Sequence, residues 1–574
     1  MKRYSYQKLA IALGLALSIA SKYAPTAAAQ DTETLPSPVE LTVPSVDSVE
    51  PERIPDAPDV LLESPPSSSE IDLIDASECL PLAETDEPRF EAAAIAVVGS
   101  SVLQDEIAAI VGCYEGVPIT LSDLFILRSQ ITQLYFENGY ITSGAFIPSS
   151  QFLDDEIQVQ VIEGKLSDVQ INGLNRLNNG YVEARIARAD GPPLNQERLQ
   201  EALQLLQLDP NIENVNAELT AGTQPGESLL ILDIEETRSF SVIATADNNR
   251  SPSVGSEELR LSANYRNLIG VGDAISASYG ITEGLNLYNV GVSVPLNASD
   301  GSVSISYSNN DSRVIEDIFE DAGIRSETET VSVAVRQPIV RSPSEEFALG
   351  LAFDWRQSQS FILDDVPFSF SIGPDDGRSQ VSALRFSQEW TKRNIKRVLA
   401  ARSQFSVGLD VLGATNNDTG TDGQFFAWLG QFQWVEQISP RSISLLKVNA
   451  QLTPDSLLPI ERFSLGGINT VRGYAQNQIV TDNAINASAE VRIPLTRNTN
   501  TLQIVPFVDA GYGWNNRVAT PDNNFLLGTG VGLRWQPTSN LLIRSDYGVP
   551  LINGDQGGSL QENGFYFSLI YQIE

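Results

Sequence analysis

The pattern of apolar and polar residues divides the chain into three parts. Residues 30–87 are rich in Pro, Ser, Asp and Glu and have too few apolar residues to bury a core, so we expect a disordered linker. Residues 88–238 mix helical and strand periodicities. From 239 to 574 the helical period disappears, and apolar residues recur at every second position, as in Val303-x-Ile-x-Tyr307 and Phe565-x-Phe-x-Leu569.

The middle part contains two copies of one small module with the order strand, helix, helix, strand, strand. In the first copy we expect a strand at 90–98, helices at 102–111 and 121–138, and strands at 140–147 and 156–162. In the second we expect a strand at 169–171, helices at 178–189 and 195–206, and strands at 215–220 and 229–235. The copies end on similar phrases, Gln160-Val-Ile-Glu-Gly164 and Leu232-Asp-Ile-Glu-Glu236. This repeat predicts two α+β domains, at 88–164 and 165–238.

The last part is typical of a membrane barrel. It holds roughly 16 alternating runs, and long polar connections, the first at about 309–327, alternate with short turns along it. A soluble sandwich has no reason to place long and short connections on opposite sides, whereas an outer-membrane barrel does. All six tryptophans lie in this part, mostly where we expect strand ends, as in an interfacial girdle. We therefore expect a 16-stranded antiparallel transmembrane β-barrel over 239–574.

The first residues have the features of a secretory signal. Lys2, Arg3 and Lys8 precede an apolar run over 9–20, and Ala27-Ala-Ala29 follows. The apolar run is too short to span a bilayer comfortably, so we expect residues 1–29 to be removed on export rather than to anchor the chain.

Composition excludes several classes of function. The formal net charge of −36 argues against a nucleic-acid partner. Histidine is absent and Cys79 and Cys113 are the only cysteines, which excludes imidazole catalysis and His or Cys metal sites. We expect no metal, no cofactor and no enzyme activity. After export the two thiols could pair as one disulfide or remain unpaired.

Two short motifs in the last part carry the candidate site. Val471-Arg472-Gly473-Tyr474 lies in the long polar connection 453–483, and Phe507-Val-Asp509-Ala-Gly511 follows in a predicted strand. The pair places a cation on a loop and a carboxylate in a strand. If loop 453–483 enters the barrel, Arg472 can form a bidentate bond with Asp509, while Gly473 permits the turn.

Glycines accompany the second motif at every second position. If Asp509 faces the lumen, side-chain alternation places Phe507, Gly511 and Gly513 on the same face. The next predicted strand repeats the spacing with Gly528, Gly530 and Gly532. Such rows let another backbone approach closely, and we expect Tyr474 to pack on this surface. In the alternative interpretation, Arg472 lies in an exposed loop and the glycines mark bulges.

Together these features resemble a known family. The order of signal, linker, two modules and barrel is similar to that of two-partner secretion transporters of the hemolysin-secretion type, whose superfamily includes the outer-membrane insertases. Further marks are Phe463-Ser-Leu-Gly-Gly467 before the Arg472 motif and Asn267-Leu-Ile-Gly-Val-Gly-Asp273 at an early hairpin. The family often begins with a pore-plugging helix, but here the linker's one helix candidate, 71–80, is short. Its first cysteine usually directly precedes the first module, whereas Cys79 lies further upstream.

The resemblance implies a monomeric outer-membrane translocase with two periplasmic POTRA domains. These would bind an unfolded exoprotein, suspected to be large and β-helical, and the barrel would pass it outward through the lipid bilayer without nucleotide hydrolysis. Strand addition to an exposed sheet edge is one way to hold such a client, and the strand at 140–147 is our choice of edge. The alternatives are an insertase that assembles other barrels, a passive solute porin, and a soluble binding protein.

Overall fold

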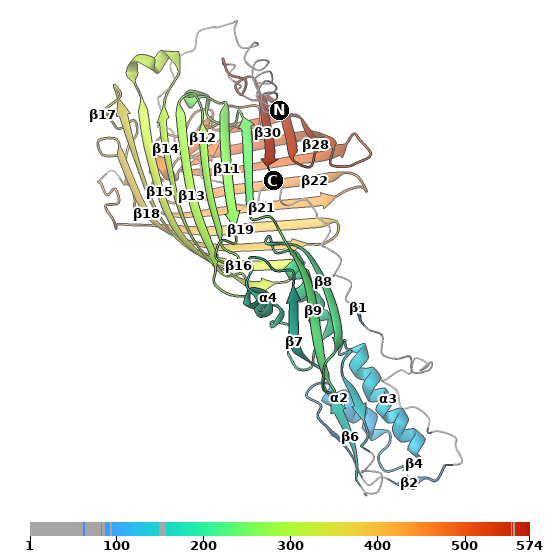
Figure 1. Ribbon diagram of the computed structural model, residues 1–574. Coiled ribbons are helices and arrows are strands. Elements are labelled where there is room, and N and C mark those ends of the chain that lie inside the picture. Colours follow the sequence, from blue (N-terminus) through green and yellow to red (C-terminus); the bar gives the residue numbers. More distant parts are fainter. Residues whose placement is uncertain are drawn as a thin grey trace.

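The modules and the barrel follow one another along the chain, and the two modules extend from one end of the barrel (Figure 1). The computed structural model describes residues 61–62, 82, 87–91, 94–148, 156–189, 191–418, 420–552, 554 and 557–573. The predicted signal, the helix candidate 71–80 and Cys79 lie outside these residues.

The first module has the predicted order of elements. Helix α3 (Leu121–Glu137) begins with a capping box in which Thr120 and Asp123 bond reciprocally. In the main sheet, in the order β3-β6-β5, β5 forms one edge, as predicted for the strand in that region. The helices pack on the sheet through apolar residues such as Leu124, Leu127 and Ile131. The other elements are β2 (Phe90–Glu91), β3 (Ala94–Val98), α2 (Gln104–Gly112), β4 (Pro118–Ile119), β5 (Gly144–Phe146) and β6 (Glu156–Ile162).

The second module repeats this arrangement with longer strands. Its sheet has the order β1-β8-β9-β7. The elements are β7 (Lys165–Asn172), α4 (Asn179–Ile186), α5 (Gln196–Gln207), β8 (Ile212–Ala221) and β9 (Glu227–Glu236). The extra strand β1 (Leu61–Leu62) comes from the predicted disordered linker, so that prediction was wrong at these two residues. Among the described residues, no helix is both long and apolar enough to cross a membrane.

The repeated phrases at the ends of the modules have one structural role. Glu163 accepts hydrogen bonds from the backbone of Ser101 at 2.6 Å, in the segment before the first helix of its module. Glu236 does the same in the second module, accepting from the backbone of Asn175 at 2.8 Å. Aligning the phrases by sequence pairs Glu163 with Glu235 instead. The structural equivalence is therefore displaced by one residue from the sequence alignment.

The barrel closes as predicted. Within 240–573, sixteen full strands form one antiparallel ring, and β10 pairs with β30 to complete it. The short strand β17 (Val366–Pro367) adds to one outer loop. The sixteen are β10 (Phe240–Asp247), β11 (Glu258–Arg266), β12 (Ala274–Ile281), β13 (Leu285–Pro295), β14 (Ser302–Arg313), β15 (Arg325–Arg341), β16 (Glu345–Ile362), β18 (Arg378–Arg393), β19 (Arg397–Leu409), β21 (Phe426–Gln437), β22 (Ile443–Leu452), β26 (Asn483–Pro494), β27 (Leu502–Trp514), β28 (Phe525–Thr538), β29 (Leu541–Pro550) and β30 (Phe565–Ile573).

The barrel wall is apolar outside and polar inside, the reverse of a soluble protein. On β27, Val508 points outward and is 51% exposed, while its neighbour Asp509 is 1% exposed. Outward side chains on other strands include Leu351, Phe386 and Val531. Buried inward residues include Ser382, Gln404, Ser406, Gln431, Asn449 and Gln451. This alternation is what a wall between lipid and a polar lumen requires.

Long and short connections lie on opposite ends of the barrel, as predicted, except that the short turn 282–284 between β12 and β13 lies on the end with the long loops. The modules adjoin the end with the short turns, because β10 follows β9 directly. Two details differ from the sequence prediction. The loop expected at about 309–327 is shorter, since β14 continues to Arg313 and β15 begins at Arg325. Trp355 lies in the interior of β16 rather than at a strand end. Polar residues continue these strands because backbone pairing does not need apolar side chains.

Candidate functional site

The connection between β22 and β26 folds into the barrel. Its two arms pair as a small antiparallel sheet of β24 (Phe463–Leu465) and β25 (Ile479–Thr481). The motif Val471-Arg472-Gly473-Tyr474 lies between these arms, and all four residues are buried. Val471 and Tyr474 join Leu526 of β28 in an apolar cluster. The loop is therefore packed against the wall, as expected for a lumenal element and not for an exposed loop.

Arg472 and Asp509 form the predicted bidentate contact. Arg472 Nε donates to Asp509 Oδ2 at 2.7 Å, and Nη2 donates to Oδ1 at 3.0 Å. The backbone N–H of Arg472 also donates to Oδ2, at 3.1 Å. Arg472 is 2% exposed. A planar guanidinium held at both carboxylate oxygens has a fixed orientation, so the contact sets the position of the loop tip as well as its charge balance.

Two further carboxylates complete the surroundings of Arg472. Its Nη1 donates to Glu490 of β26 and to Asp546 of β29, both at 3.1 Å. The guanidinium carbon lies 3.5 Å from the ring centroid of Phe507, so the predicted inward residue of β27 stacks against the cation. Arg472 therefore contacts three strands of the wall, β26, β27 and β29, through one side chain.

The extra acids are themselves paired on their own strands. Arg492 contacts Glu490 at 3.2 Å, and Arg544 contacts Asp546 at 2.6 Å. Sequence reasoning missed Glu490 and Asp546. A signal was present: each belongs to an acid–base pair two residues apart in a strand, which places both charges on one face. Opposite charges on one face of a predicted barrel strand indicate a lumenal position.

The predicted glycines divide into two groups. Gly511 and Gly513 adjoin loop side chains, and a Cβ on Gly528 would overlap the carbonyl of Arg472. Gly530 and Gly532 instead leave room for Phe507 and Asp546 of the neighbouring strands. One further glycine, Gly548 of β29, was not predicted, and a Cβ there would lie 2.5 Å from the backbone nitrogen of Gly473.

The closest loop atoms belong to Val471 at Gly511, Thr481 at Gly513, Arg472 at Gly528 and Gly473 at Gly548, so the predicted packing of Tyr474 on the glycines was wrong in detail. The Tyr474 side chain passes beyond the glycines, and its Oη donates to the carbonyls of Leu527, at 3.0 Å, and Ile552. The backbone of the loop depends on the absence of Cβ atoms more than the Tyr474 ring does, because a main chain cannot change rotamer to avoid a Cβ.

Tyr566 of β30 forms hydrogen bonds with two backbone groups at the end of the motif. The N–H of Gly473 donates to Tyr566 Oη at 2.9 Å, and that hydroxyl donates to the carbonyl of Tyr474 at 2.6 Å. Gly473 has φ +103°, which favours glycine. The last strand of the barrel therefore also contacts the loop tip, a contact that no sequence pattern indicated.

Glu461 attaches the base of the same loop to another part of the wall. It lies in a single 3-10 turn (Pro459–Glu461) and is 4% exposed. Arg356 of β16 contacts its carboxylate at 3.1 Å, and Arg385 of β18 contacts it at 2.8 Å. Arg385 also contacts Asp354 at 2.5 Å. Sequence reasoning missed this second attachment because Glu461 belongs to no repeated pattern.

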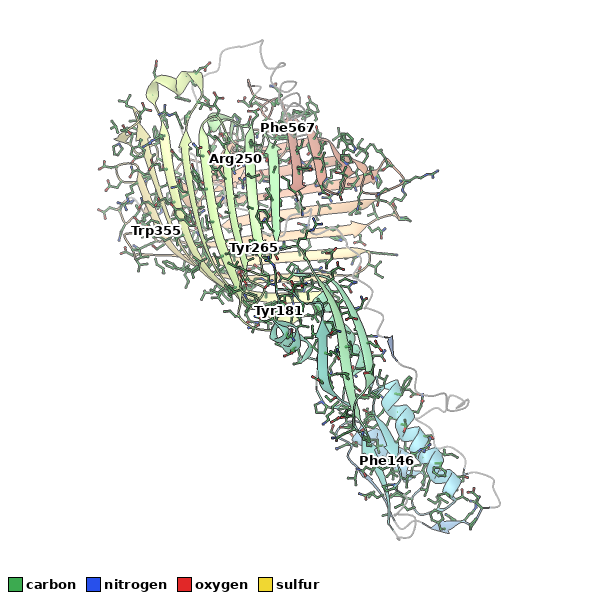
Figure 2. All side chains as sticks on the ribbon, viewed as in Figure 1. Phe146, Tyr181, Arg250, Tyr265, Trp355 and Phe567 are labelled. Atoms are coloured by element: carbon green, nitrogen blue, oxygen red, sulfur yellow. The ribbon has the colours of Figure 1, made fainter. Side chains whose placement is uncertain are left out.

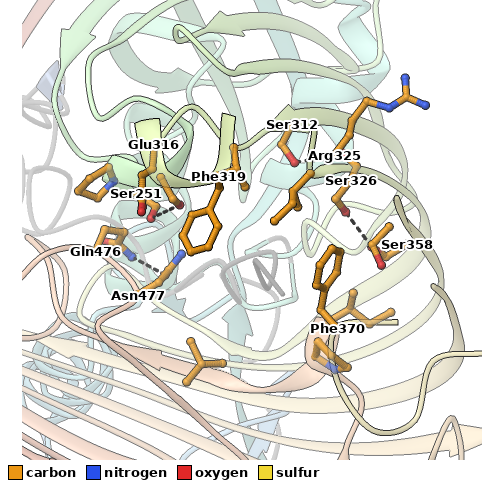
Figure 3. A pocket seen from close by; sticks show the side chains of 18 of the residues that line it. Ser251, Ser312, Glu316, Phe319, Arg325, Ser326, Ser358, Phe370, Gln476 and Asn477 are labelled. Atoms are coloured by element: carbon orange, nitrogen blue, oxygen red, sulfur yellow. Dashed lines mark hydrogen bonds between the residues drawn. The ribbon is translucent and has the colours of Figure 1, made fainter. Parts of the chain in front are cut away.

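A cavity of about 330 Å³ remains beside the loop tip (Figure 3). Gln476 and Asn477 of the loop form one side of it. Hydroxyl groups of Ser326 and Ser358 line the wall, and Phe319 reaches it from the outer loop that contains the 3-10 helix Asp317–Ala322. Among the described residues, no group of three or more His, Cys, Asp or Glu is placed to hold a metal ion. The arrangement positions a loop and lines a narrow polar space.

The turn between β11 and β12 carries the second module. It contains the sequence Asn267 to Asp273, and the carbonyl of Gly270 accepts from Asn178 at the start of α4 at 2.9 Å. Gly270 and Gly272 have φ near +80 to +90°, and a Cβ on Gly272 would overlap Tyr181. Arg176 donates to Tyr265 Oη, and Figure 2 places Tyr181 and Tyr265 at this junction. The sequence Asn267 to Asp273 therefore attaches the second module to the barrel.

The predicted disulfide concerns a residue outside the described part of the chain. Cys113, which directly follows α2, is disulfide-bonded. Its predicted partner, Cys79, lies outside the described residues.

Comparison with known proteins decides the family. The model of the haemolysin secretion/activation proteins ShlB/FhaC/HecB matches residues 226–535, and that of the ShlB-type POTRA domain matches residues 90–164. The chain belongs to the haemolysin secretion/activation protein family. Family members are two-partner secretion transporters of the outer membrane, and their POTRA domains lie in the periplasm.

Individual relatives agree with this assignment. The Heme/hemopexin transporter protein HuxB of Haemophilus influenzae (strain ATCC 51907 / DSM 11121 / KW20 / Rd) is 22% identical over 65% of this chain and 66% of its own length. The Outer membrane transporter CdiB of Escherichia coli O6:K15:H31 is 22% identical over 82% of this chain and 81% of its own.

Solved structures support the fold. CdiB from Escherichia coli has a TM-score of 0.65 at 20% identity, covering 89% of this chain and 93% of that one. BamA from Haemophilus ducreyi, lacking POTRA domains 1–3, has a TM-score of 0.53 at 15% identity, covering 84% and 100%. The expected 16-stranded barrel is confirmed.

Proposed function

We propose that this haemolysin secretion/activation family member exports one partner protein. Its two periplasmic modules bind the unfolded exoprotein in an extended form, and the barrel lumen leads it outward. A monomeric barrel suffices, with its apolar face in lipid. The process uses no nucleotide, no cofactor and no catalytic residue.

The observation that supports this proposal most is the internal loop. The loop lies in the lumen against glycines of the wall. Its Arg472 contacts three carboxylates of the wall. A passive solute porin would not need two periplasmic modules in line with its pore. An insertase is the closer alternative, and two modules rather than a longer array favour a secretion transporter.

The test is export of a defined client. The client to use is a large exoprotein, sought first among the products of genes neighbouring that of this chain, and we expect it to be β-helical. It would be co-expressed with this chain in a host lacking both, and its amount in the medium would be measured. A matched variant lacking 88–236 should leave the client in the periplasm.

Two outcomes would overturn the proposal. If the client stays inside with the intact chain while other barrels depend on this chain for assembly, the insertase is correct. If planar bilayers show a large, steady conductance that is unchanged by deleting 88–236, the porin is correct.

A further inference from the structure

Three neighbouring turns at the module end of the barrel carry only basic charges. They connect β18 to β19, β21 to β22 and β26 to β27, and these strands are consecutive in the ring. The segments that span them, 392–397, 438–442 and 495–501, contain Lys and Arg but no Asp or Glu, in a chain whose formal net charge is −36. We call their six exposed basic residues the basic rim: Lys392, Arg393, Lys396, Arg397, Arg441 and Arg497.

The basic rim is one continuous surface. Arg397 of the first turn contacts Glu436, at the end of the strand that enters the second turn, with N and O atoms 2.7 Å apart. Arg441 of the second turn donates to the carbonyl of Thr496 in the third. The three turns therefore present their charges side by side.

Few carboxylates balance these cations. Glu436 is paired with Arg397, and Glu345 is paired with Lys392 at 3.1 Å. Within the described part of the chain, the other four members of the basic rim form no ion pair with a carboxylate: Arg393, Lys396, Arg441 and Arg497. Four exposed cations are therefore available to an anionic partner.

Apolar residues place this surface at the boundary between lipid and water. Each of the three turns has one apolar residue that is more than half exposed: Ile395, Ile438 and Leu495. On β21 the outward ring of Trp434 is also exposed, and the guanidinium of Arg397 lies over it, 5.7 Å from the ring centroid. Tryptophan is enriched where headgroups meet the hydrocarbon core, and exposed aliphatic side chains are stable there. The basic rim therefore lies at the level of the lipid headgroups.

The loops at the other end of the barrel have the opposite charge. Residues 314–324, 363–377 and 410–425 contain Asp and Glu but no Lys or Arg. Acidic loops repel anionic headgroups, whereas basic segments at a membrane surface attract them. Arginine also matches phosphate oxygens through paired N–H groups. The charge distribution therefore favours an anionic phospholipid on the module side, which faces the periplasm.

We propose that the basic rim is a binding surface for anionic phospholipid headgroups of the periplasmic leaflet of the outer membrane. The lipid phosphates neutralise the four unpaired cations, and the three apolar turn residues lie among the adjoining acyl chains. Binding along this face fixes the depth and tilt of the barrel at the end that carries the modules. The inference concerns the lipid contact alone and goes beyond the proposed export function.

The first experiment compares two lipids that differ in headgroup charge. The probes are dioleoylphosphatidylglycerol, which is anionic, and dioleoylphosphatidylcholine, which is zwitterionic. Each is titrated onto the full detergent-solubilised chain, and bound lipid is counted by native mass spectrometry. We expect the anionic lipid to bind at least about 10-fold more tightly, and this ratio to fall when ammonium acetate is raised from about 0.05 to 0.5 M. Equal affinity for the two lipids, or a ratio that salt leaves unchanged, would overturn the proposal.

The second experiment assigns the preference to the basic rim. The rim variant combines Arg393→Gln, Lys396→Gln, Arg441→Gln and Arg497→Gln. The control changes the net charge equally at four exposed arginines of the second module and the outer end of the barrel, and combines Arg188→Gln, Arg198→Gln, Arg313→Gln and Arg517→Gln. We expect the rim variant to bind the two lipids within about 2-fold of each other, while the control keeps the wild-type ratio. Heat-modifiable migration checks that both barrels are folded. The same ratio in both variants contradicts a role for the rim.

A third variant separates charge from apolar contact. Ile395→Ser with Ile438→Ser and Leu495→Ser should weaken binding of both lipids and leave the ratio between them unchanged. Loss of the ratio here would assign the preference to apolar contacts and overturn the proposal.

A final comparison separates lipid from protein as the partner. If the rim variant keeps the wild-type lipid ratio but no longer binds the denatured exoprotein, the surface docks an acidic segment of that protein and the lipid proposal is wrong. A chain that meets all the lipid expectations but exports no exoprotein overturns the proposed function alone.

Discussion

Glu461 and Arg472 belong to one loop and bind opposite sides of the barrel with opposite charges. Glu461 contacts Arg356 of β16, and Arg472 contacts Asp546 of β29. In ring order, leaving out β17, β16 is the seventh and β29 the fifteenth of the sixteen full strands. The loop thus crosses the lumen and is held at each side by ion pairs.

Removing the Arg472–Asp509 pair should abolish export without unfolding the barrel. Arg472→Ala leaves Asp509, Glu490 and Asp546 without their shared cation, and breaking such a buried pair costs about 3–5 kcal/mol. This cost falls on the docked loop, because the strand ladders remain. We expect Asp509→Ala to have the same effect. Barrel folding would be checked by heat-modifiable migration, and export by client in the medium.

Two variants calibrate this result. Arg472→Lys keeps the charge but loses the bidentate geometry, so it should export at an intermediate level. Arg313→Ala, which breaks the exposed pair with Asp364, should export normally. Normal export by both Arg472→Ala and Asp509→Ala would remove the positioning role of the loop.

Neutralising Glu461 should loosen the other end of the loop. Glu461→Gln keeps the side-chain size but leaves Arg356 and Arg385 without their shared carboxylate. We expect faster hydrogen exchange over 456–465 and more frequent open states in planar bilayers. Glu345→Gln, which weakens a pair with Lys392 at the opposite end of the barrel, is the control. Equal conductance in the two variants would contradict a role for Glu461 in closing the pore.

A single methyl group should displace the loop tip. Gly528→Ala places a Cβ against the carbonyl of Arg472, and forced overpacking of this kind costs about 1–3 kcal/mol. The expected result is a folded barrel with increased protease cleavage near 471–474 and reduced export. Gly558→Ala is the matched control, since its Cβ would meet nothing within 4 Å. If both variants resist protease equally, the position of the loop tip does not depend on the absence of a Cβ at Gly528.

Acid should weaken the first module through Glu163. Burial alone would raise the pKa of this carboxyl, but hydrogen bonds from Ser101, Tyr135 and Val102 hold it below its ordinary value. A lowered folded pKa stabilises the module fully above the ordinary glutamate pKa of about 4.3, and this contribution is lost as pH falls below it. Exchange of the Ser101 and Val102 amides, corrected for intrinsic rates, should rise in that range. In Glu163→Gln the rise should disappear; its persistence would assign the effect to another group.

Local periodicity was sufficient to predict the modules and the barrel. For β27 it gave a conditional prediction: if Asp509 faced the lumen, Phe507 had to face it as well, because side chains alternate along a strand. The loop's entry into the lumen was one of two interpretations of the sequence, and the burial of Arg472 in the structure decides for it.

Contacts between distant segments could not be predicted in the same way. Glu461 and Tyr566 act at sites that only ring closure brings near the loop, and neither belongs to a local pattern. The pairing of Leu61–Leu62 with β8 was missed because two residues are too few to show a period. The continued strands around Arg313 and Arg325 were missed because polar residues there resemble a loop.

The polar inner wall has a consequence for the direction of transport. Hydroxyls and amides that are not buried, such as those of Ser276, Asn289 and Ser306, offer a passing polypeptide hydrogen bonds equal in kind to those of water. A polypeptide in contact with such a surface therefore gains little binding free energy and loses little when it moves on. Under the proposed export, such a wall would favour neither direction of movement along the barrel.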